Sequence, residues 1–361
     1  MSQKSSTFAV AKVLNDNKQL KYYQFYLNIM RKIFFLCALC ATMTAFATDG
    51  ALSGKFSIDW NGHQIVFSQG NLQFQASTGT WRFAENQLDI IGSANTNISD
   101  TYSGWIDLFG FSTSGYNEHY PWLKTTSNAA YDPGDTVPDL NGTEFDWGYH
   151  NPIANGGNTK GLWRTPSQSD MMYILRSRDN ADNLFFQVTI NGQEGALLLP
   201  DDWTPIAGIT LHPLTDYGSW NGGRFTPTSS SPDLDLFTYN ALTIAQWQQL
   251  EAKGAVFFPS GGIRLTSDNT WQSLCKYWLS GRFSKYMGNN IHFHPTNTCL
   301  SCSYANEEGL PVRLIQDVKS GGTTALDNSA ADAKAAKRLV NGQLLIERDG
   351  RIYNAQGVEV K

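Results

Sequence analysis

The sequence predicts an α+β fold in which two helices pack on antiparallel sheets joined by long ordered loops, followed by a short C-terminal β tail. Three observations support this prediction. Short apolar or alternating segments bounded by turn residues recur along the chain, as in antiparallel strands. Only two segments combine a helix-start signal with helical apolar spacing. The composition is 41% hydrophobic and only 16% charged, with 32 glycines, which suits a turn-rich protein with a substantial core.

The N-terminal segment carries an export signal. Residues 1–29 lack clear periodicity and are interpreted as an extension ahead of a later start at Met30. Residues 30–47 then have the positive, apolar and small-residue parts of a signal peptide, with Ala47 as the last residue removed. The apolar run is too short to span a bilayer comfortably, so we expect no stable transmembrane segment after cleavage. We therefore expect an extracytoplasmic protein that is secreted, periplasmic or on the cell surface. A short membrane anchor and a lipoprotein acylated at Cys40 are the alternatives.

The mature chain opens with a predicted β-meander over residues 55–83. Its segments alternate apolar and polar residues and are separated by turn signals, of which Asn61-Gly62 is the strongest. Residues 92–160 are instead rich in Gly, Asn, Ser, Thr and Asp, with aromatic residues at intervals. A long loop inside a compact domain is uncommon unless it is functional. We expect the aromatic side chains to pin this segment to the body as ordered loops.

The first predicted helix begins at Thr165. Thr165 can cap the helix, Pro166 suits its first turn, and Gln168 completes a capping box. Beyond it, residues 185–190 and 196–199 are apolar segments around an Asn-Gly turn. This arrangement predicts a β-hairpin.

The second predicted helix begins at Thr243, which has the same capping pattern, and ends at Gly254, because glycine accepts the left-handed backbone of a helix end. It leads into the apolar segment 255–258, which is too short for a helix and rich in aromatic residues. We expect this segment to be a buried strand around which the domain is organised. Residues 276–280 and 311–315 are predicted to be its partner strands.

The composition changes after Asp317. Residues 318–337 have no aromatic side chain and consist mostly of small and polar residues, which predicts a linker between the body at 48–317 and the tail. Residues 338–361 contain Asn-Gly and Asp-Gly turns around an apolar segment and predict a short β-hairpin. Since roughly 24 residues bury little surface alone, we expect this tail to dock on something or to act as a sorting signal.

Five segments, in order, resemble motifs of the Fibrobacter succinogenes major paralogous domain family. They are Gly161–Pro166, Ala196–Trp203, Gly254–Arg264, Tyr277–Ser280 and Leu310–Asp317. The resemblance covers roughly residues 52–318 and implies a C-type lectin-like fold in the branch shared with formylglycine-generating enzymes. It also implies an exported protein of Bacteroidetes-type bacteria. The chain departs from the family pattern at Leu279, where the family has serine, and around Ile263, where the family has an aromatic residue.

Tryptophans in polar, turn-rich stretches are the predicted ligand-binding residues, because aromatic rings offer apolar faces and loops on a rigid scaffold often carry binding sites. They are Trp105, Trp122, Trp147, Trp220 and Trp271. The alternative for each is a core position. We expect a non-catalytic binding or adhesion domain whose loops at 92–160 and 204–240 meet a glycan or an envelope protein.

A candidate metal site lies near the C-terminal end of the body. His292, His294, Cys299 and Cys302 are four zinc-ligand types within eleven residues, and the two histidines would share one face of a strand. In the alternative, the histidines are surface residues and two cysteines pair, with Cys275 bonded to Cys299 or Cys302, or the thiols stay buried. Three cysteines in the mature chain allow at most one disulfide and leave one thiol.

Other functional classes are not supported by the sequence. The calcium motifs of sugar-binding C-type lectins are missing, and the carboxylates at 132–135 and 232–235 are interpreted as solvated loop residues, so we expect no cofactor. No nucleophile with its base, hydrolase elbow or phosphate loop is present, which argues against an enzyme. A net charge of -5 without a basic patch argues against nucleic acid as a partner. An enzyme of the formylglycine-generating type and a purely structural envelope component remain the alternatives.

Overall fold

The computed structural model describes residues 49–228, 235–265, 270–271 and 274–318, and three further strands at 335–340, 343–348 and 351–354. The predicted extension (1–29) and signal peptide (30–47) lie outside these residues. Contacts divide the chain into two compact units, Met1–Asp317 and Val318–Lys361. In the described parts of the chain, no helix has the length and apolar character needed to cross a membrane.

Within its described residues, the helices of the first unit are short. They are η1 (Gly92–Asn97), η2 (Tyr116–Glu118), η3 (Asn128–Tyr131), α2 (Trp147–His150), α3 (Gln168–Met172), η4 (Tyr173–Ser177), η5 (Ala181–Asn183), η6 (Leu214–Asp216) and α4 (Ile244–Glu251). Most of the regular structure is in sheets, so the prediction of a mixed fold with mostly strands and few helices is confirmed. Residues 92–160, expected as ordered loops, contain η1, η2, η3 and α2.

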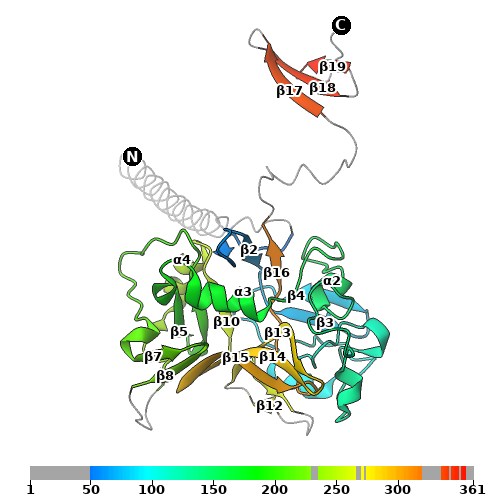
Figure 1. Cartoon of the computed structure of the whole chain (residues 1–361), viewed down its shortest axis with the longest axis vertical. Helices are drawn as coiled ribbons and strands as arrows, with labels where there is room; N and C mark the ends of the chain where they lie inside the picture. Colours follow the sequence, from blue (N-terminus) through cyan, green and yellow to red (C-terminus); the bar gives the residue numbers. More distant parts are fainter. Residues whose placement is uncertain are drawn as a thin grey trace, which may run out of the picture. The chain divides into compact units, whose positions relative to one another are not determined.

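Two larger sheets form the body of this unit. One has the order β13 (Cys275–Ser284), β14 (Met287–His294), β15 (Asn297–Ala305), β8 (Arg224–Pro227) and β7 (Gly218–Asn221), all antiparallel. The other has the order β10 (Val256–Pro259), β6 (Gln193–Leu198), β5 (Phe185–Ile190) and β9 (Ala241–Leu242), with β9 parallel to β5. Figure 1 shows α3 lying across β13, β14 and β15, all three of which it contacts.

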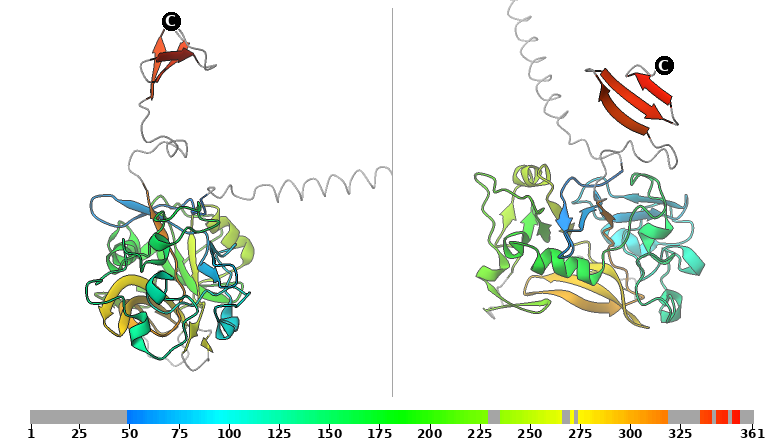
Figure 2. Two further views of the ribbon diagram at one scale, coloured as in Figure 1. Left: turned by 90° about the vertical axis from the view of Figure 1, so that its right-hand side faces the viewer. Right: turned by 45° about the horizontal axis from the view of Figure 1, so that its top comes forward.

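The smaller sheets complete the unit. They are β1 (Phe56–Ser57) with β2 (Gln64–Phe67) and β16 (Ile315–Asp317), β3 (Leu72–Gln75) with β4 (Thr80–Phe83), and β11 (Ile263–Arg264) with β12 (Thr270–Trp271). The predicted continuous meander over residues 55–83 is therefore wrong: it forms two separate hairpins. The reason is that β16 occupies the edge of β2 that β3 would need. In Figure 2, the loops after β4 and the four-stranded sheet lie on opposite sides of this unit.

The four-stranded sheet has an apolar layer on each face. Phe258 and Leu198 belong to a buried cluster shared with the five-stranded sheet, whereas Phe257 and Leu197 point to the other face. There they pack with Trp247 and other apolar residues of α4. Successive side chains of a strand point to opposite faces, so near-continuous apolar strands are expected in a sheet buried on both sides.

The strand expected at 255–258 is present as β10, but its predicted partners are wrong. β10 pairs with β6, with Val256 opposite Leu198. Residues 276–280 belong to β13, which pairs with β14 and meets β10 through side chains. In the segment 311–315 only Ile315 is in a strand, and it pairs with β2 instead. Pattern identified β10 and the strand at 276–280 but not the conformation of residues 311–314, and the pairing follows from contacts between residues far apart in sequence.

The second predicted helix agrees with α4 in its caps. Thr243 and Gln246 form the capping box, with the Gln246 amide N–H donating to the Thr243 hydroxyl oxygen over 3.3 Å. Gly254 has φ +84°, and the N–H groups of Gly254 and Ala255 donate to the carbonyls of Glu251 and Leu250. These are the two hydrogen bonds of a Schellman motif.

The first helix starts later than predicted. Ser167 caps α3, in a capping box completed by Asp170. The predicted cap, Thr165, is buried and donates its backbone N–H to the Asp146 carboxylate over 2.9 Å. Gln168 is the first residue of the helix, and its side chain donates to the Ser301 hydroxyl over 2.8 Å. Thr165 therefore bonds Asp146, the N-cap residue of α2, and the next hydroxyl residue, Ser167, caps α3.

The second unit is a three-stranded antiparallel sheet, β17 (Ala335–Val340), β18 (Gln343–Arg348) and β19 (Arg351–Asn354). The tail is expected as a short β-hairpin over residues 338–361 with turns on both sides of its apolar segment, and the described residues here form three paired strands. β17 also begins inside the predicted linker 318–337.

Candidate functional sites

The five tryptophans predicted to bind ligand are not assembled into one surface. Trp147 is fully buried in the core, as the alternative reading expected. The half-buried Trp105 ring lies 3.7 Å from the Arg82 guanidinium, and Trp122 stacks on Tyr120 with ring centroids 4.9 Å apart. These contacts hold each ring against its own part of the body.

The remaining two tryptophans lie elsewhere. Trp220, in β7, is half-buried beneath the Arg176 guanidinium at 4.5 Å. Trp271 belongs to β12 by its backbone, but its side chain lies outside the described residues. Among the four of these five tryptophans whose rings the structure describes, no ring contact joins one to another. The loops therefore carry no shared aromatic platform of the predicted residues.

A pocket of about 310 Å³ is formed instead by the segment that follows β6. Its apolar lining includes Phe186, Leu199, Trp203, Ile206, Ile209 and Leu211. Its polar lining consists of Asn180, Asn183 and Thr210. A mostly apolar, aromatic cavity of this size with a few convergent polar groups is the usual form of a small-ligand site.

Two contacts fix the wall of this pocket. Lys253, just after α4, donates to the Thr204 hydroxyl and carbonyl oxygens over 2.9 and 3.3 Å. Asn240, which is buried, accepts from the His212 N–H over 2.7 Å and donates to the His212 carbonyl over 3.0 Å. The segment between these two anchors is thereby held in place. A pocket held in its binding geometry loses little conformational entropy on binding.

The polar rim presents a donor and an acceptor. The Asn183 side-chain amide donates to the Asn180 side-chain oxygen over 2.7 Å. In the described residues this leaves the Asn180 Nδ2 group and the Asn183 Oδ1 atom without a partner. Both side chains are exposed, so these atoms are available to a ligand. An amide pair of this kind can donate to one hydroxyl and accept from its neighbour.

Sequence reasoning missed this pocket, although its tryptophan lies in one of the quoted motifs, Ala196–Trp203. A usable signal was present: Trp203, Ile206, Ile209 and Leu211 are large apolar residues in a segment without strand or helix periodicity. Large apolar side chains are stabilised by packing against other apolar residues. Here they pack against the buried cluster that α4 forms with the four-stranded sheet.

The predicted metal site is wrong. Cys299 and Cys302 form a disulfide, so neither provides a thiolate, and Cys275 stays a free buried thiol. One disulfide and one thiol agree with the cysteine count, but the suggested pairing through Cys275 is wrong. Over the described ranges, no group of three or more His, Cys, Asp or Glu side chains could hold a metal ion.

The histidines of that prediction lie among positive charges. Burial, together with charge repulsion from Lys276, His294 and Arg224, lowers the pKa of His292 to about 3. Burial is also the main cause of the lowered pKa of His294, and Lys276 adds to it. His292 is therefore a neutral imidazole beside two cationic side chains.

The carboxylates at 132–135 form ion pairs with a cationic side chain of the protein itself. The Arg282 guanidinium lies 2.9 Å from Asp132 and 3.1 Å from Asp135. An arginine thus takes the place that a cation would need between them. Of the second segment considered for calcium, 232–235, only Asp235 is described.

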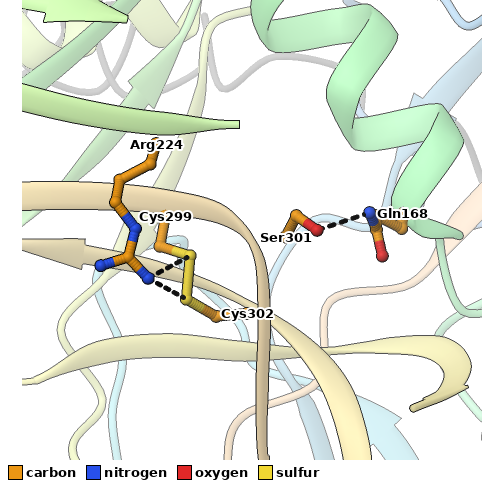
Figure 3. Close-up of a disulfide and its surroundings, with 5 residues drawn as sticks. All are labelled: Gln168, Arg224, Cys299, Ser301 and Cys302. Carbon is orange, nitrogen blue, oxygen red and sulfur yellow. Dashed lines mark hydrogen bonds between the residues drawn. A yellow bond between two sulfur atoms is a disulfide. The ribbon is translucent and has the colours of Figure 1, made fainter. Parts of the chain in front are cut away.

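Figure 3 shows the disulfide with its neighbours. Arg224 reaches over the two sulfurs from β8, and its Nη2 lies 4.0 Å from both Cys299 Sγ and Cys302 Sγ. On the other side, Ser301 accepts the hydrogen bond from Gln168 of α3. On this face of the five-stranded sheet, a guanidinium group therefore lies beside a disulfide.

No family model, curated protein or solved structure matches the chain. The resemblance to the Fibrobacter succinogenes major paralogous domain family, and the C-type lectin-like fold that it implies, therefore stay predictions.

Proposed function

We propose that this chain is a non-catalytic, exported binding domain of C-type lectin-like fold that holds a glycan in the pocket beside Trp203. The observation that carries the proposal is the pocket itself, which is lined by a tryptophan, other apolar side chains and two exposed amides. Sugars present apolar C–H faces and neighbouring hydroxyl groups. The lining offers partners for both, since aromatic rings cover apolar surface and amides both donate and accept hydrogen bonds.

The size of the pocket limits the ligand. A volume of about 310 Å³ is at the lower end of small-ligand sites and suits one or two sugar rings. Longer glycans would continue past the exposed rim at Asn180 and Asn183. The proposed ligand is therefore a terminal mono- or disaccharide unit of a larger glycan.

The lining favours recognition without a metal ion. Its polar side chains are two amides and one hydroxyl, which are neutral, and no carboxylate of the described residues lines the pocket. Calcium in proteins is held by several oxygen ligands, most often including carboxylates. Binding is thus expected to persist when divalent ions are removed.

The test is a glycan-array screen of the purified full-length chain, with and without chelator, followed by titration calorimetry of each hit. Trp203→Ala is expected to weaken binding at least about tenfold, because truncating a tryptophan anchor that the bound partner covers commonly costs about 2 kcal/mol or more. Asn183→Ala should weaken it less.

Two controls make the test specific. Phe283→Ala removes a ring that is 66% exposed in β13, outside the pocket, and should bind as the parent does. Trp122→Ala tests the site expected from the sequence. Loss of binding in Trp122→Ala with retention in Trp203→Ala would move the site to the 92–160 loops. An array without hits, together with capture of a protein on the same pocket, would replace the glycan by a protein partner.

A further inference from the structure

The Cys299–Cys302 disulfide spans an irregularity in β15. His292 of β14 lies opposite Cys299, and Asn290 lies opposite Cys302. Three steps along β15 thus match two along β14, which is the count of a β-bulge. In a regular strand, residues three apart point to opposite faces. The bulge brings both cysteines to one face, with their Cα atoms 5.8 Å apart.

This position gives the bond a small role in holding the fold. A bridge between residues three apart closes a very short loop and constrains the unfolded chain less than a bridge over a long loop. The ladder between β14 and β15 also continues on both sides of the bulge, from Met287–Ala305 to His294–Asn297. Hydrogen bonds already hold the two strands together there.

The surroundings of the bond are instead those of a reactive pair. Arg224 lies opposite Cys299 in the sheet, with Nη2 4.0 Å from each sulfur, and forms no ion pair with the described residues. A guanidinium in this position stabilises a thiolate. Cys302 is half-buried and Cys299 is buried, so the outer sulfur is the one that a small molecule can reach.

We propose that Cys299 and Cys302 form a thiol–disulfide exchange site, which reacts at Cys302 with low-molecular-weight thiols while Arg224 holds the leaving Cys299 thiolate. In the first step a thiolate attacks Cys302 Sγ, a mixed disulfide forms, and the Sγ–Sγ bond breaks with its electron pair on Cys299. In the second step another small-molecule thiolate attacks the sulfur that the first one contributed to the mixed disulfide, and Cys302 leaves as a thiolate. Two thiols are oxidised to one disulfide, and the protein pair gains two electrons.

Cys275 provides a reference inside the same chain. It is fully buried, its thiol lies 3.4 Å from the Phe258 carbonyl oxygen, and burial raises its pKa. A thiol in such an environment is inert. Labelling of Cys275 would therefore report unfolding of the body and not exchange at the disulfide.

The test incubates the folded full-length chain with glutathione redox buffers, stops the reaction by alkylating the still-folded chain at neutral pH with excess reagent, and measures each cysteine peptide by mass spectrometry. We expect Cys299 and Cys302 to become reduced while Cys275 stays unlabelled and the circular dichroism spectrum is unchanged. A pair that is reduced only when Cys275 is also labelled would overturn the proposal.

Variants assign the roles within the pair. Arg224→Gln is expected to slow reduction about threefold or more, as when the pKa of a leaving thiol rises by one unit, whereas Arg224→Lys keeps most of the rate. Cys299→Ser should trap a glutathione adduct on Cys302, and Cys302→Ser should give little adduct on the buried Cys299. Equal rates in the parent and Arg224→Gln, or equal adducts in both serine variants, would contradict the assigned roles.

Discussion

Buried polar side chains determine the conformation of the 92–160 loops. Ser112, at φ +62°, donates to the Tyr131 carbonyl over 2.9 Å, and His119 Nδ1 lies 2.7 Å from the same hydroxyl. Ser114 donates to the Glu144 carbonyl over 2.7 Å. Each of these contacts joins parts of the loop that are distant along it. Buried polar groups need partners, so these hydrogen bonds make the loop conformation specific.

His119 should make the stability of the protein depend on pH. Burial lowers its pKa below the ordinary value, and the Asp132 carboxylate only partly opposes this. The unfolded chain therefore takes up a proton below about pH 6.5 where the folded chain does not, so this contribution is present at neutral pH and is lost as the pH falls. Denaturant unfolding of the parent at about pH 7.5 and about pH 5 should show the loss across the ordinary histidine pKa.

The matched variant is His119→Asn, which can keep the hydrogen bond to Ser112 without the titrating ring. Its loss of stability between the two pH values should be smaller than that of the parent. His212→Asn changes a histidine with an exposed side chain and should follow the parent. A parent and His119→Asn with the same pH dependence would show that the ring takes up its proton freely in the folded state.

At the scale of elements, the turn between α4 and β10 meets the segment just before β1 at a contact between two glycines. A Cβ on Gly254 would lie 2.6 Å from the Gly54 Cα, and a Cβ on Gly54 would lie 2.1 Å from the Gly254 carbonyl oxygen. The turn that ends α4 thus packs directly on the backbone just before β1. Only residues without a side chain permit this approach, which explains Gly254 better than its capping role alone.

Gly254→Ala should accordingly destabilise the protein more than a left-handed backbone explains. Gly192 is the matched control, since its φ of +86° is similar but no atom lies within 4 Å of its Cβ position. Gly192→Ala should cost about 1–2 kcal/mol in free energy of unfolding. Gly254→Ala should cost about 1–3 kcal/mol more because of overpacking. Equal denaturation midpoints for the two variants would mean that the backbones separate easily.

At the scale of the whole molecule, the first unit is closed by its own C-terminal strand. Ile315 in β16 is buried, lies opposite Phe67 in β2, and exchanges backbone hydrogen bonds with Arg164. The Arg164 side chain also bonds Asp317 over 2.8 Å and Asp170 over 2.7 Å. Three distant parts of the chain therefore meet where the unit ends.

Removal of the second unit should leave the first intact. A chain that ends at Val318 is expected to unfold within about 0.5 kcal/mol of the full chain, as is usual for changes away from packed regions. A chain that ends at Leu314 lacks β16 and should fail to fold or lose most of its stability. If the Val318 chain binds the glycan but is no longer displayed on cells, the tail serves attachment. Similar stabilities for the two shortened chains would refute a closing role for β16.

Features with a local cause could be predicted from the sequence. The Thr243 capping box, the Gly254 helix end and the turn at Asn191-Gly192, where φ is +48° and +86°, each depend on a few neighbouring residues. The partners of β10 and the interruption of the first meander depend on contacts between distant segments. Periodicity identifies a strand, but it does not determine which other strand pairs with it.

The candidate sites show the same division. Composition indicated that the loops are rich in aromatic residues, but it could not separate Trp147, which is in the core, from Trp203, which lines the pocket. The disulfide between Cys299 and Cys302 requires a bulge in β15, because a regular strand would separate the two sulfurs. The residues between the two cysteines carry no pattern that predicts this bulge.

The pairing of β16 with β2 also determines how long one edge of β2 stays unpaired during biosynthesis. β2 is among the first strands made, whereas its partner is roughly 250 residues further along the chain. At about 5–20 residues per second, one edge of β2 has no partner for about 12–50 s after it leaves the ribosome. An unpaired edge strand is a template for association with other chains. Yield in cells should therefore depend on chaperones that cover the nascent chain during this interval.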